Sequence, residues 1–332
     1  MPQTGLSWGR VVAGHGRHVL VETHQGQRVI CHPRGKQNLA VVGDEVQWLP
    51  STDEGTIEAI EPRRNLLFRQ DELRTKSFAA NLDLVLIWLA AEPEFSEHQL
   101  ARALIASEAA GIGAAIMLNK SDLKESFNRA WNRLAPYRQM GYEVSPMSLK
   151  PHDIRHPDAP PLDSAPDLAS PPLSLLLGKV TLLLGPSGAG KSTLVNGLVP
   201  NAQALTGEIS KALNSGKHTT THTRWYWLAH PFDLEVKSAL IDSPGFQEFG
   251  LQHLNPMQLT GLMPDIKAHA QECKFYNCTH LHEPGCAVIA SVGTASAKTA
   301  NSDSPPLSSD QIHPLRYKIY KDLFEELSVK RY

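Results

Sequence analysis

The chain is organised around a glycine-rich run, Gly185-Pro186-Ser187-Gly188-Ala189-Gly190-Lys191-Ser192-Thr193. The apolar segment 180–184 before it is typical of a buried strand, and residues 194–199 can continue as a helix. A strand, a G-x-x-x-x-G-K-S/T loop and a helix, in this order, are the context of a phosphate-binding P-loop. Lys191 would reach the β- and γ-phosphates, and the Ser192 hydroxyl would bind Mg²⁺. A glycine-rich turn without a ligand is the alternative, but the Lys-Ser pair and both flanks favour nucleotide binding.

Length and composition limit the class of protein. A chain of 332 residues can bury the cores of two or three domains, and its 41% hydrophobic and 20% charged residues are ordinary for a globular protein. No apolar run approaches the length that spans a bilayer, and the N-terminus lacks a secretory signal, so we expect a cytoplasmic protein without membrane contact. The net charge of −2 implies that any contact with nucleic acid uses a local patch.

Residues 1–78 are predicted to form an N-terminal barrel domain. Short runs of alternating apolar residues, with turn residues between them, lie at 10–13, 18–22, 27–31, 44–48 and 55–60. Five strands in this length fit a small antiparallel barrel of the OB-fold type, whose usual ligands are oligonucleotides. A barrel that serves only as a docking platform is equally compatible with these residues. The cationic stretch within 63–76 either contacts phosphates or forms a solvated linker.

An α/β pattern follows the barrel, and we assign residues 79–255 to a P-loop nucleotide-binding domain. The apolar runs 82–89 and 114–118 are typical of buried strands, with an amphipathic helix at 96–110 between them. A helix over 123–139 and a strand at 142–144 are expected next. A connector rich in Pro, Asp and Ala follows at about 150–172.

The strand at 114–118 is followed by a four-residue motif, Asn119-Lys120-Ser121-Asp122. In P-loop GTPases an N-K-x-D motif recognises guanine, because the Asp carboxylate accepts from the base N1–H and exocyclic amine, which adenine cannot offer. A buried acceptor left without its donors costs about 1–3 kcal/mol. Because doubly wound folds bind ligands at the carboxyl ends of their strands, guanine recognition is favoured over a simple turn. Ser148 and Leu149 lie where a GTPase places a loop that also touches the base.

Two further segments fit contacts to Mg²⁺ and the γ-phosphate. The polar stretch 207–223 contains several threonines, of which Thr220 is the candidate to bind Mg²⁺ in a switch that orders with triphosphate. A threonine-rich surface loop is the alternative. The later motif Asp242-Ser243-Pro244-Gly245 is a D-x-x-G, in which Asp242 would hold Mg²⁺ through water and the Gly245 N–H would contact the γ-phosphate.

The residue after the D-x-x-G motif is Phe246, where many GTPases have a glutamine that orients the attacking water. An apolar ring cannot position a nucleophile, so we expect slow intrinsic hydrolysis. Gln247 is displaced by one residue. His218 is the candidate to orient water once a partner orders its loop, and an ordinary surface histidine is the alternative.

The GTPase motifs occur in a permuted order. Ordinary GTPases run P-loop, threonine switch, D-x-x-G and N-K-x-D, whereas here N-K-S-D precedes the P-loop. A circular permutation keeps the same sheet and moves the chain ends, which is tolerated because termini lie at the surface. The D-x-x-G motif therefore leads directly into the C-terminal part of the chain.

Residues 256–332 are expected to be mainly helical and to bind a metal. Four ligands fall in one short span: Cys273, Cys278, His280 and Cys286. Three thiolates and one imidazole suit one tetrahedral, structural Zn²⁺ with no open position. Buried free cysteines are the alternative, and His282 is a second candidate imidazole. The run 291–310, dense in Ser, Thr, Ala and Pro, predicts a flexible insertion before a C-terminal helix.

The combination of motifs resembles one family, the circularly permuted, small-ribosomal-subunit-dependent GTPases known as RsgA or YjeQ. The resemblance covers nearly the whole chain, and it also includes residues 80–83, 216–220 and Arg316-Tyr317. It implies Mg²⁺-dependent GTP hydrolysis to GDP, stimulated by the small ribosomal subunit during its late maturation, with rRNA contacts. We also expect a monomer. The connector, the insertion and Pro186-Ser187 depart from the family without touching a motif residue.

Other functions share parts of this pattern. The P-loop also resembles those of guanylate kinases and ABC-type ATPases, but no phosphoacceptor site or L-S-G-G-Q signature accompanies it. A second alternative is an RNA-binding protein without enzymatic activity, in which nucleotide only stabilises the fold. GTP turnover with and without small subunits separates these alternatives.

Overall fold

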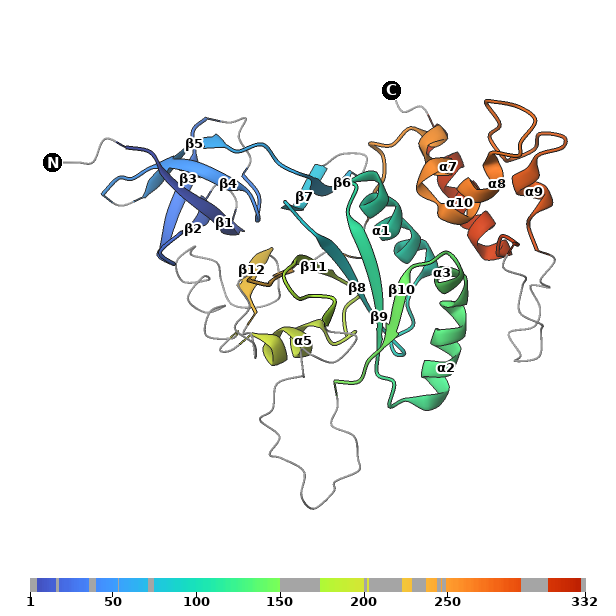
Figure 1. The fold of residues 1–332 in the computed structure, drawn as a ribbon, viewed down its shortest axis with the longest axis horizontal. Helices are drawn as coiled ribbons and strands as arrows, with labels where there is room; N and C mark the ends of the chain where they lie inside the picture. The colour runs from blue at the N-terminus through green and yellow to red at the C-terminus, as the bar shows by residue number, and fades with distance from the viewer. Residues whose placement is uncertain are drawn as a thin grey trace, which may run out of the picture.

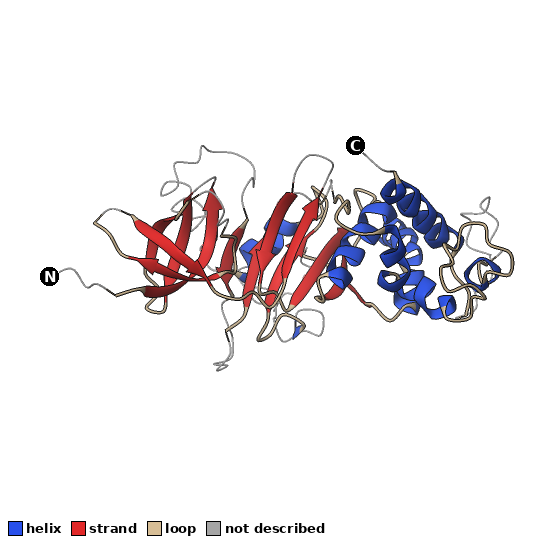
Figure 2. Cartoon of the chain, turned by 90° about the horizontal axis from the view of Figure 1, so that it is seen from above, coloured by secondary structure: helices blue, strands red, loops and turns tan. Residues whose placement is uncertain are grey.

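A computed structural model describes residues 5–15, 18–35, 40–52, 54–70, 75–149, 174–199, 202, 223–228, 237–243, 246, 249–293 and 310–329. This part of the chain is elongated. An N-terminal barrel, a central sheet with flanking helices and a C-terminal group of helices follow one another along the long axis (Figures 1 and 2). Much of residues 207–223 and 291–310, and all of 150–172, lie outside the described residues.

Five strands close into the N-terminal barrel, in the order β1-β2-β3-β5-β4 and back to β1. They are β1 (Ser7–His15), β2 (His18–Thr23), β3 (Arg28–Pro33), β4 (Glu45–Leu49) and β5 (Gly55–Ile60). Alternating apolar residues such as Val21, Val46 and Ile57 fill its interior. The expected barrel is confirmed, with one correction: β3 and β5 are parallel. In a closed ring with an odd number of strands, directions cannot alternate throughout, so one pair must be parallel.

A two-stranded hairpin joins the barrel to the central sheet. For this part of the chain the sequence pattern allowed two alternatives, a solvated linker or a phosphate-binding patch. Its strands are β6 (Leu66–Gln70) and β7 (Thr75–Ala80). Arg63 makes a bidentate ion pair with the buried Asp44 of the barrel, and Arg64 pairs with Asp83 at 2.8 Å. These two cations are therefore engaged in holding the junction together.

The central sheet is parallel from β10 through β9, β8 and β11 to β13. Its strands are β8 (Leu84–Ala90), β9 (Gly113–Asn119), β10 (Glu143–Pro146), β11 (Val180–Leu184), β12 (Arg224–Trp227) and β13 (Ala239–Asp242). Strand β12 is antiparallel to β13 and also pairs with β1 of the barrel, with Ala13 opposite Arg224. The barrel and the central sheet are thus hydrogen-bonded to each other.

Helices cover both faces of the central sheet. Helices α1 (Glu97–Ala109), α2 (Lys124–Arg133) and α3 (Ala135–Gln139) pack on one face, and α5 (Lys191–Leu198) packs on the other (Figure 1). Strand β8 alternates accordingly: Val85 and Ile87 face α1, whereas Leu86 and Trp88 face α5.

The prediction of a single helix over 123–139 is wrong in one respect. The helical segment is interrupted at Leu134, which separates α2 from α3, and Pro136 lies in the first turn of α3. Proline lacks an N–H and its ring clashes with the carbonyl four residues earlier, so a continuous helix cannot pass through this position without a kink.

In the described residues, the C-terminal part contains short and long helices joined by turns, with residues 271–286 outside any helix. The helices are η1 (Pro256–Gln258), α7 (Leu259–Leu262), α8 (Pro264–Ala270), α9 (Ala287–Ala290) and α10 (Pro314–Ser328). Helix α10 is tied to α1 by an ion pair of Arg102 with Glu326, and His98 Nε2 lies 3.5 Å from the Asp322 carboxylate. None of the described helices is both long and apolar enough to cross a membrane.

Candidate nucleotide and metal sites

The glycine-rich run forms a loop between β11 and α5, as the sequence predicts. Gly188 and Gly190 have φ of +77° and +98°, the left-handed region that favours glycine. Gly185 lies so close to strand β8 that an added Cβ would stand 2.1 Å from the Trp88 carbonyl oxygen. Ala189 is buried beneath the loop, whereas Ser187, Gly188, Ser192 and Thr193 are exposed. The exposed side is the one that a phosphate chain can reach.

Lys191 folds back over its own loop. Its Nζ donates hydrogen bonds to the carbonyls of Gly185 at 2.7 Å and Pro186 at 2.8 Å. Burial lowers the pKa of Lys191, and the nearby Asp242 carboxylate opposes that shift. The Lys191 ammonium therefore lies against the loop backbone and near Asp242, where it is incompletely solvated, which strengthens its attraction to an anion.

The base-recognition motif lies at the end of β9, directly beside the loop. Asn119 is buried, and its Nδ2 donates to the Ala189 carbonyl at 2.9 Å. Lys120 has φ of +65°, and its Nζ donates to the Glu92 carbonyl. The Ser121 N–H donates to the Met147 carbonyl at 3.0 Å. The structure therefore brings the N-K-S-D motif against the P-loop, although 65 residues separate Gly185 from Lys120 in sequence.

The exposed Asp122 carboxylate accepts a hydrogen bond from Ser148 Oγ at 3.1 Å. The loop that begins after β10 therefore reaches the end of the N-K-S-D motif, where the sequence placed Ser148 and Leu149. The Asp122 carboxylate therefore stays accessible to a base, while the hydrogen bond from Ser148 restrains its orientation.

Asp242 ends strand β13, opposite Leu183 of β11. It is 8% exposed, and burial raises the pKa of its carboxyl although Lys191 and Arg224 act in the opposite direction. The neighbouring Ser243 Oγ lies 3.1 Å from Thr223 Oγ1. A buried carboxylate beside the P-loop lysine is suited to a cation, because a cation would compensate its charge.

Phe246 is 2% exposed and packs into the core on the α1 face of the sheet. Its ring cannot orient a water molecule, as the sequence predicts. His218, Thr220, Pro244, Gly245 and Gln247 lie outside the described residues.

The four predicted metal ligands form one cluster. The ligand atoms of Cys273, Cys278, His280 and Cys286 all lie within 4.8 Å of one another. Cys273 Sγ is 3.8 Å from Cys286 Sγ, and His280 Nδ1 is 3.5 and 3.4 Å from these two sulfurs. Tetrahedral ligands at about 2.3 Å from zinc stand about 3.8 Å apart, so the cluster fits that ion. His282 is exposed and lies outside the cluster, so the geometry favours His280 over His282 as the imidazole.

Neighbouring groups hold the cluster in place. Tyr317 Oη donates to the His280 carbonyl at 2.8 Å, and Tyr320 Oη donates to the Thr279 carbonyl at 3.0 Å. Glu283 accepts from the Thr279 side chain and from backbone N–H groups of the same turn. Partial burial opposes ionisation, but these hydrogen bonds hold the pKa of Glu283 well below its usual range.

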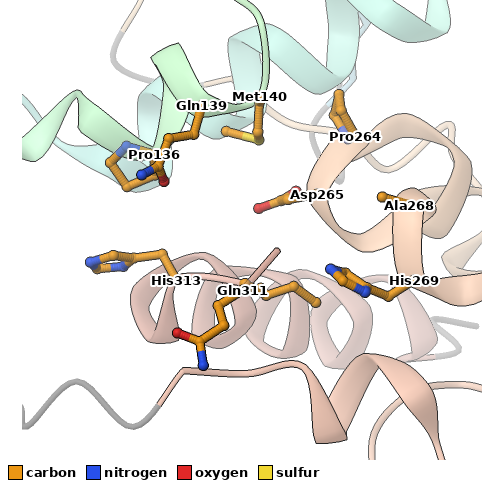
Figure 3. Close-up of a pocket in the computed structure, with 10 residues that line it drawn as sticks. Pro136, Gln139, Met140, Pro264, Asp265, Ala268, His269, Gln311 and His313 are labelled. Atoms are coloured by element: carbon orange, nitrogen blue, oxygen red, sulfur yellow. The ribbon is translucent and has the colours of Figure 1, made fainter. Parts of the chain in front are cut away.

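A separate cavity of about 210 Å³ lies between α3 and the C-terminal helices (Figure 3). Asp265 on its wall is held by a bidentate ion pair with Arg316, whose guanidinium lies over the Tyr137 ring at 5.2 Å. None of the described residues that line this cavity belongs to the P-loop or the metal cluster. Arg316, one residue of the family resemblance, therefore joins two helical layers.

The sequence pattern gave no sign of one residue at the nucleotide site, Trp88. It lies within an apolar strand, and its contact to the P-loop joins residues 101 positions apart. Periodicity shows only that this side chain is buried.

Comparisons with known proteins agree with the geometry. A family model described as RsgA GTPase matches residues 60–252. A protein of Variovorax paradoxus named small ribosomal subunit biogenesis GTPase RsgA is 63% identical over 324 residues, which cover 98% of this chain and 93% of that protein. One of the same name from Burkholderia mallei is 47% identical over 96% of this chain and 92% of its own length.

Two solved structures share the fold. YjeQ from Thermotoga maritima superposes with a TM-score of 0.64 at 24% identity, covering 98% of this chain and all of that one. YloQ, described as a circularly permuted GTPase, gives a TM-score of 0.63 at 23% identity over 99% of this chain and 98% of that one.

Proposed function

Since this chain belongs to the RsgA GTPase family, and is therefore an enzyme that hydrolyses GTP, we propose that it acts on the small ribosomal subunit during late maturation of that subunit. The observation that carries the proposal is the match of nearly the whole chain to a relative named for this role. A cytoplasmic location follows from that partner. We propose the layout inferred from the sequence: an OB-fold domain over 1–78, a circularly permuted GTPase domain over 79–255 and a zinc-binding domain over 256–332.

The proposed roles at the nucleotide site follow from position and chemistry. Asp122 selects guanine, and the exposed loop around Gly188 and Lys191 receives the phosphates. Ser192, with Asp242 and Thr220, would hold Mg²⁺, and Gly245 would contact the γ-phosphate. When bound, Mg²⁺ neutralises charge that develops on the β- and γ-phosphate oxygens. The raised pKa of the Asp242 carboxyl supports this proposal, because its charge is only partly compensated by Lys191 and Arg224.

Activation by the partner is proposed because the residue directly after the D-x-x-G motif is Phe246, whereas many GTPases have a water-orienting glutamine there. Phe246 is buried in the core there. We propose that contact with the small subunit orders the switch around the nucleotide and that His218 then orients water. Groups supplied by a partner raise GTPase turnover by about 10³–10⁵-fold in other systems.

The barrel and the zinc-binding domain are the proposed rRNA contacts. They lie at opposite ends of the described chain, on either side of the central sheet (Figures 1 and 2). In the turn between the first two metal ligands, Tyr276 is fully exposed and Phe275 is 43% exposed, with Lys274 Nζ 5.9 Å from the Phe275 ring. Exposed aromatic side chains next to a cation suit stacking on unpaired bases and attraction to phosphates.

The identity of the metal is proposed from its ligands. Three sulfurs and one nitrogen at tetrahedral spacing favour Zn²⁺ over hard cations such as Mg²⁺, which prefer oxygen. The four protein ligands fill a tetrahedral shell, so the role would be structural.

The test is GTP hydrolysis by the purified chain, alone and with small ribosomal subunits, with large subunits as the matched control. We expect slow turnover alone, acceleration by orders of magnitude with small subunits and no acceleration with large ones. A rate that small subunits leave unchanged would refute the proposed partner. In the same assay, His218→Ala should lose mainly the stimulated part of the rate.

A further inference from the structure

Trp88 is a fully buried residue near the end of β8, and its side chain faces the P-loop. Its indole Nε1–H donates a hydrogen bond to the Ala189 carbonyl at 2.9 Å. The same carbonyl oxygen accepts the hydrogen bond from Asn119 Nδ2, also at 2.9 Å. A carbonyl oxygen has two lone pairs, so these two donors satisfy it completely.

The orientation of the Ala189 carbonyl matters because the same peptide unit carries the Gly190 N–H on its opposite side. A peptide unit is planar and trans, so its C=O and N–H point in opposite directions. An Ala189 carbonyl held toward the buried indole therefore turns the Gly190 N–H toward the opposite, outer side of the loop. N–H groups on that side are the ones a P-loop uses to bind phosphates.

The Ala189–Gly190 peptide needs hydrogen bonds to fix its orientation, because the glycines next to it allow the backbone to rotate. Gly188 and Gly190 both have positive φ, and glycine passes between positive and negative φ at little cost. A peptide unit next to such residues can rotate between two orientations unless hydrogen bonds hold it. Trp88 and Asn119 supply those bonds from two different strands, β8 and β9.

The backbone around Trp88 also fits closely under the loop. Gly185 approaches the Trp88 carbonyl, and a Cβ at Gly188 would lie 3.4 Å from Pro93 Cδ in the segment that follows β8. Packing alone does not account for the indole bond. Trp225 is equally buried in the central sheet, yet its indole nitrogen has no hydrogen-bond partner among the described residues.

We propose that Trp88 is a positioning residue for GTP hydrolysis, which fixes the Ala189–Gly190 peptide so that the Gly190 N–H faces the nucleotide phosphates. The inference rests on the nucleotide site of the proposed function and names a determinant within it. It acts through the P-loop backbone and needs no contact between the indole and the nucleotide.

The first test compares Trp88→Phe with Trp225→Phe in nucleotide-binding titrations with GDP and GTP. Trp88→Phe removes a donor that holds the loop and is expected to raise both dissociation constants about 3- to 10-fold. Trp225→Phe removes an indole N–H without an acceptor and is expected to leave both within about twofold of wild type. Equal effects of the two substitutions would overturn the proposal.

A double-mutant cycle separates positioning from general packing. Trp88→Phe or Asn119→Ala alone leaves one donor on the Ala189 carbonyl, whereas the double variant leaves a buried carbonyl with none. We therefore expect the combined loss of GTP affinity to exceed the product of the two single losses. A combined loss equal to that product would show that the two side chains do not act through one carbonyl, and would contradict the proposal.

If Trp88→Phe does not fold, benzothienylalanine at position 88 keeps the shape of the ring system and removes only the N–H. The same 3- to 10-fold loss is expected. Wild-type affinity in this protein would overturn the proposal. Failure of the wild-type chain to bind GTP would instead count against the nucleotide site itself, so the two failures are distinguishable.

Discussion

Among the described residues, the nucleotide site joins segments that are far apart in the sequence, from Trp88 through Asn119 and the P-loop to Asp242, whereas the four residues of the Cys/His cluster all lie between Cys273 and Cys286. The nucleotide site is held by the parallel pairing of β8, β9, β11 and β13. The metal cluster instead depends on one short segment and on hydrogen bonds from the tyrosines of α10.

The two sites also belong to different cores. Ala189, Leu194 and Trp88 pack together on the α5 face of the sheet, while Cys278 and Cys286 join the core on the α1 face. The sheet lies between these cores. We therefore expect the metal to stabilise the C-terminal helices while the nucleotide site depends mainly on the sheet.

The largest expected effect is that of metal removal. Structural zinc sites contribute about 10–16 kcal/mol of apparent binding free energy, which is folding free energy for the unit that they hold. Cys286→Ser, or strong chelation, should unfold the C-terminal helices. Hydrogen exchange across α8, α9 and α10 measures this loss, with β8 and β9 as the internal control. Elemental analysis that finds no zinc in a folded wild-type chain would contradict the expectation.

Lys191→Ala should have the next largest effect, on turnover. It removes a cation from a partly buried site where charge develops, and losses of about 10²–10³-fold are typical for such groups. Phosphate release measures the rate, with Lys179→Ala, on the segment before β11, as a matched control that should retain wild-type turnover. Ser192→Ala should likewise lower turnover strongly, through loss of the hydroxyl proposed for Mg²⁺.

Asp122→Asn should exchange the preferred base. The amide no longer accepts both guanine donors but can donate to the extra carbonyl of xanthine, so GTP affinity should fall and affinity for xanthosine triphosphate should rise. A mismatch of about 1–3 kcal/mol corresponds to roughly 5- to 150-fold. Competition titrations with both nucleotides measure the exchange. Equal affinity of the wild-type chain for ATP and GTP would show that this residue does not select the base.

The sequence predicted local features of both sites well, because each depends on neighbouring residues. The alternation at 55–60 predicted β5 with its observed bounds, and the cysteine spacing predicted the four residues that cluster. The flanks of Gly185 and Thr193 likewise predicted a strand and a helix.

Features that depend on contacts between distant segments were not predictable in this way. The pairing of β12 with β1 joins Ala13 to Arg224, and no local pattern encodes the partner of an edge strand. The hairpin β6–β7 was missed because its strands are short and carry charges such as Arg69. The indole bond of Trp88 depends on the positions of two strands and a loop.

The smallest expected effect concerns stability and pH. The folded-state pKa of Asp242 is raised above its ordinary value of 3.8, because burial disfavours the carboxylate. The carboxyl therefore destabilises the fold once pH rises through the folded-state pKa, and it costs nothing below pH 3.8, where it is protonated in both states. Asp242→Asn should raise the melting temperature of the nucleotide-free chain slightly at pH 7 and lose this gain in acid, while it lowers turnover. A melting temperature that falls at pH 7 would contradict the assignment.

The central claim is that the nucleotide site is held by the sheet, while the metal-bound helices serve the partner. Its most direct test measures GTP affinity and small-subunit stimulation together in Cys286→Ser. We predict a GTP dissociation constant within about threefold of wild type, a difference under about 1 kcal/mol, together with loss of most of the stimulation. GTP binding that disappears with the metal, or stimulation that survives without it, would contradict the account.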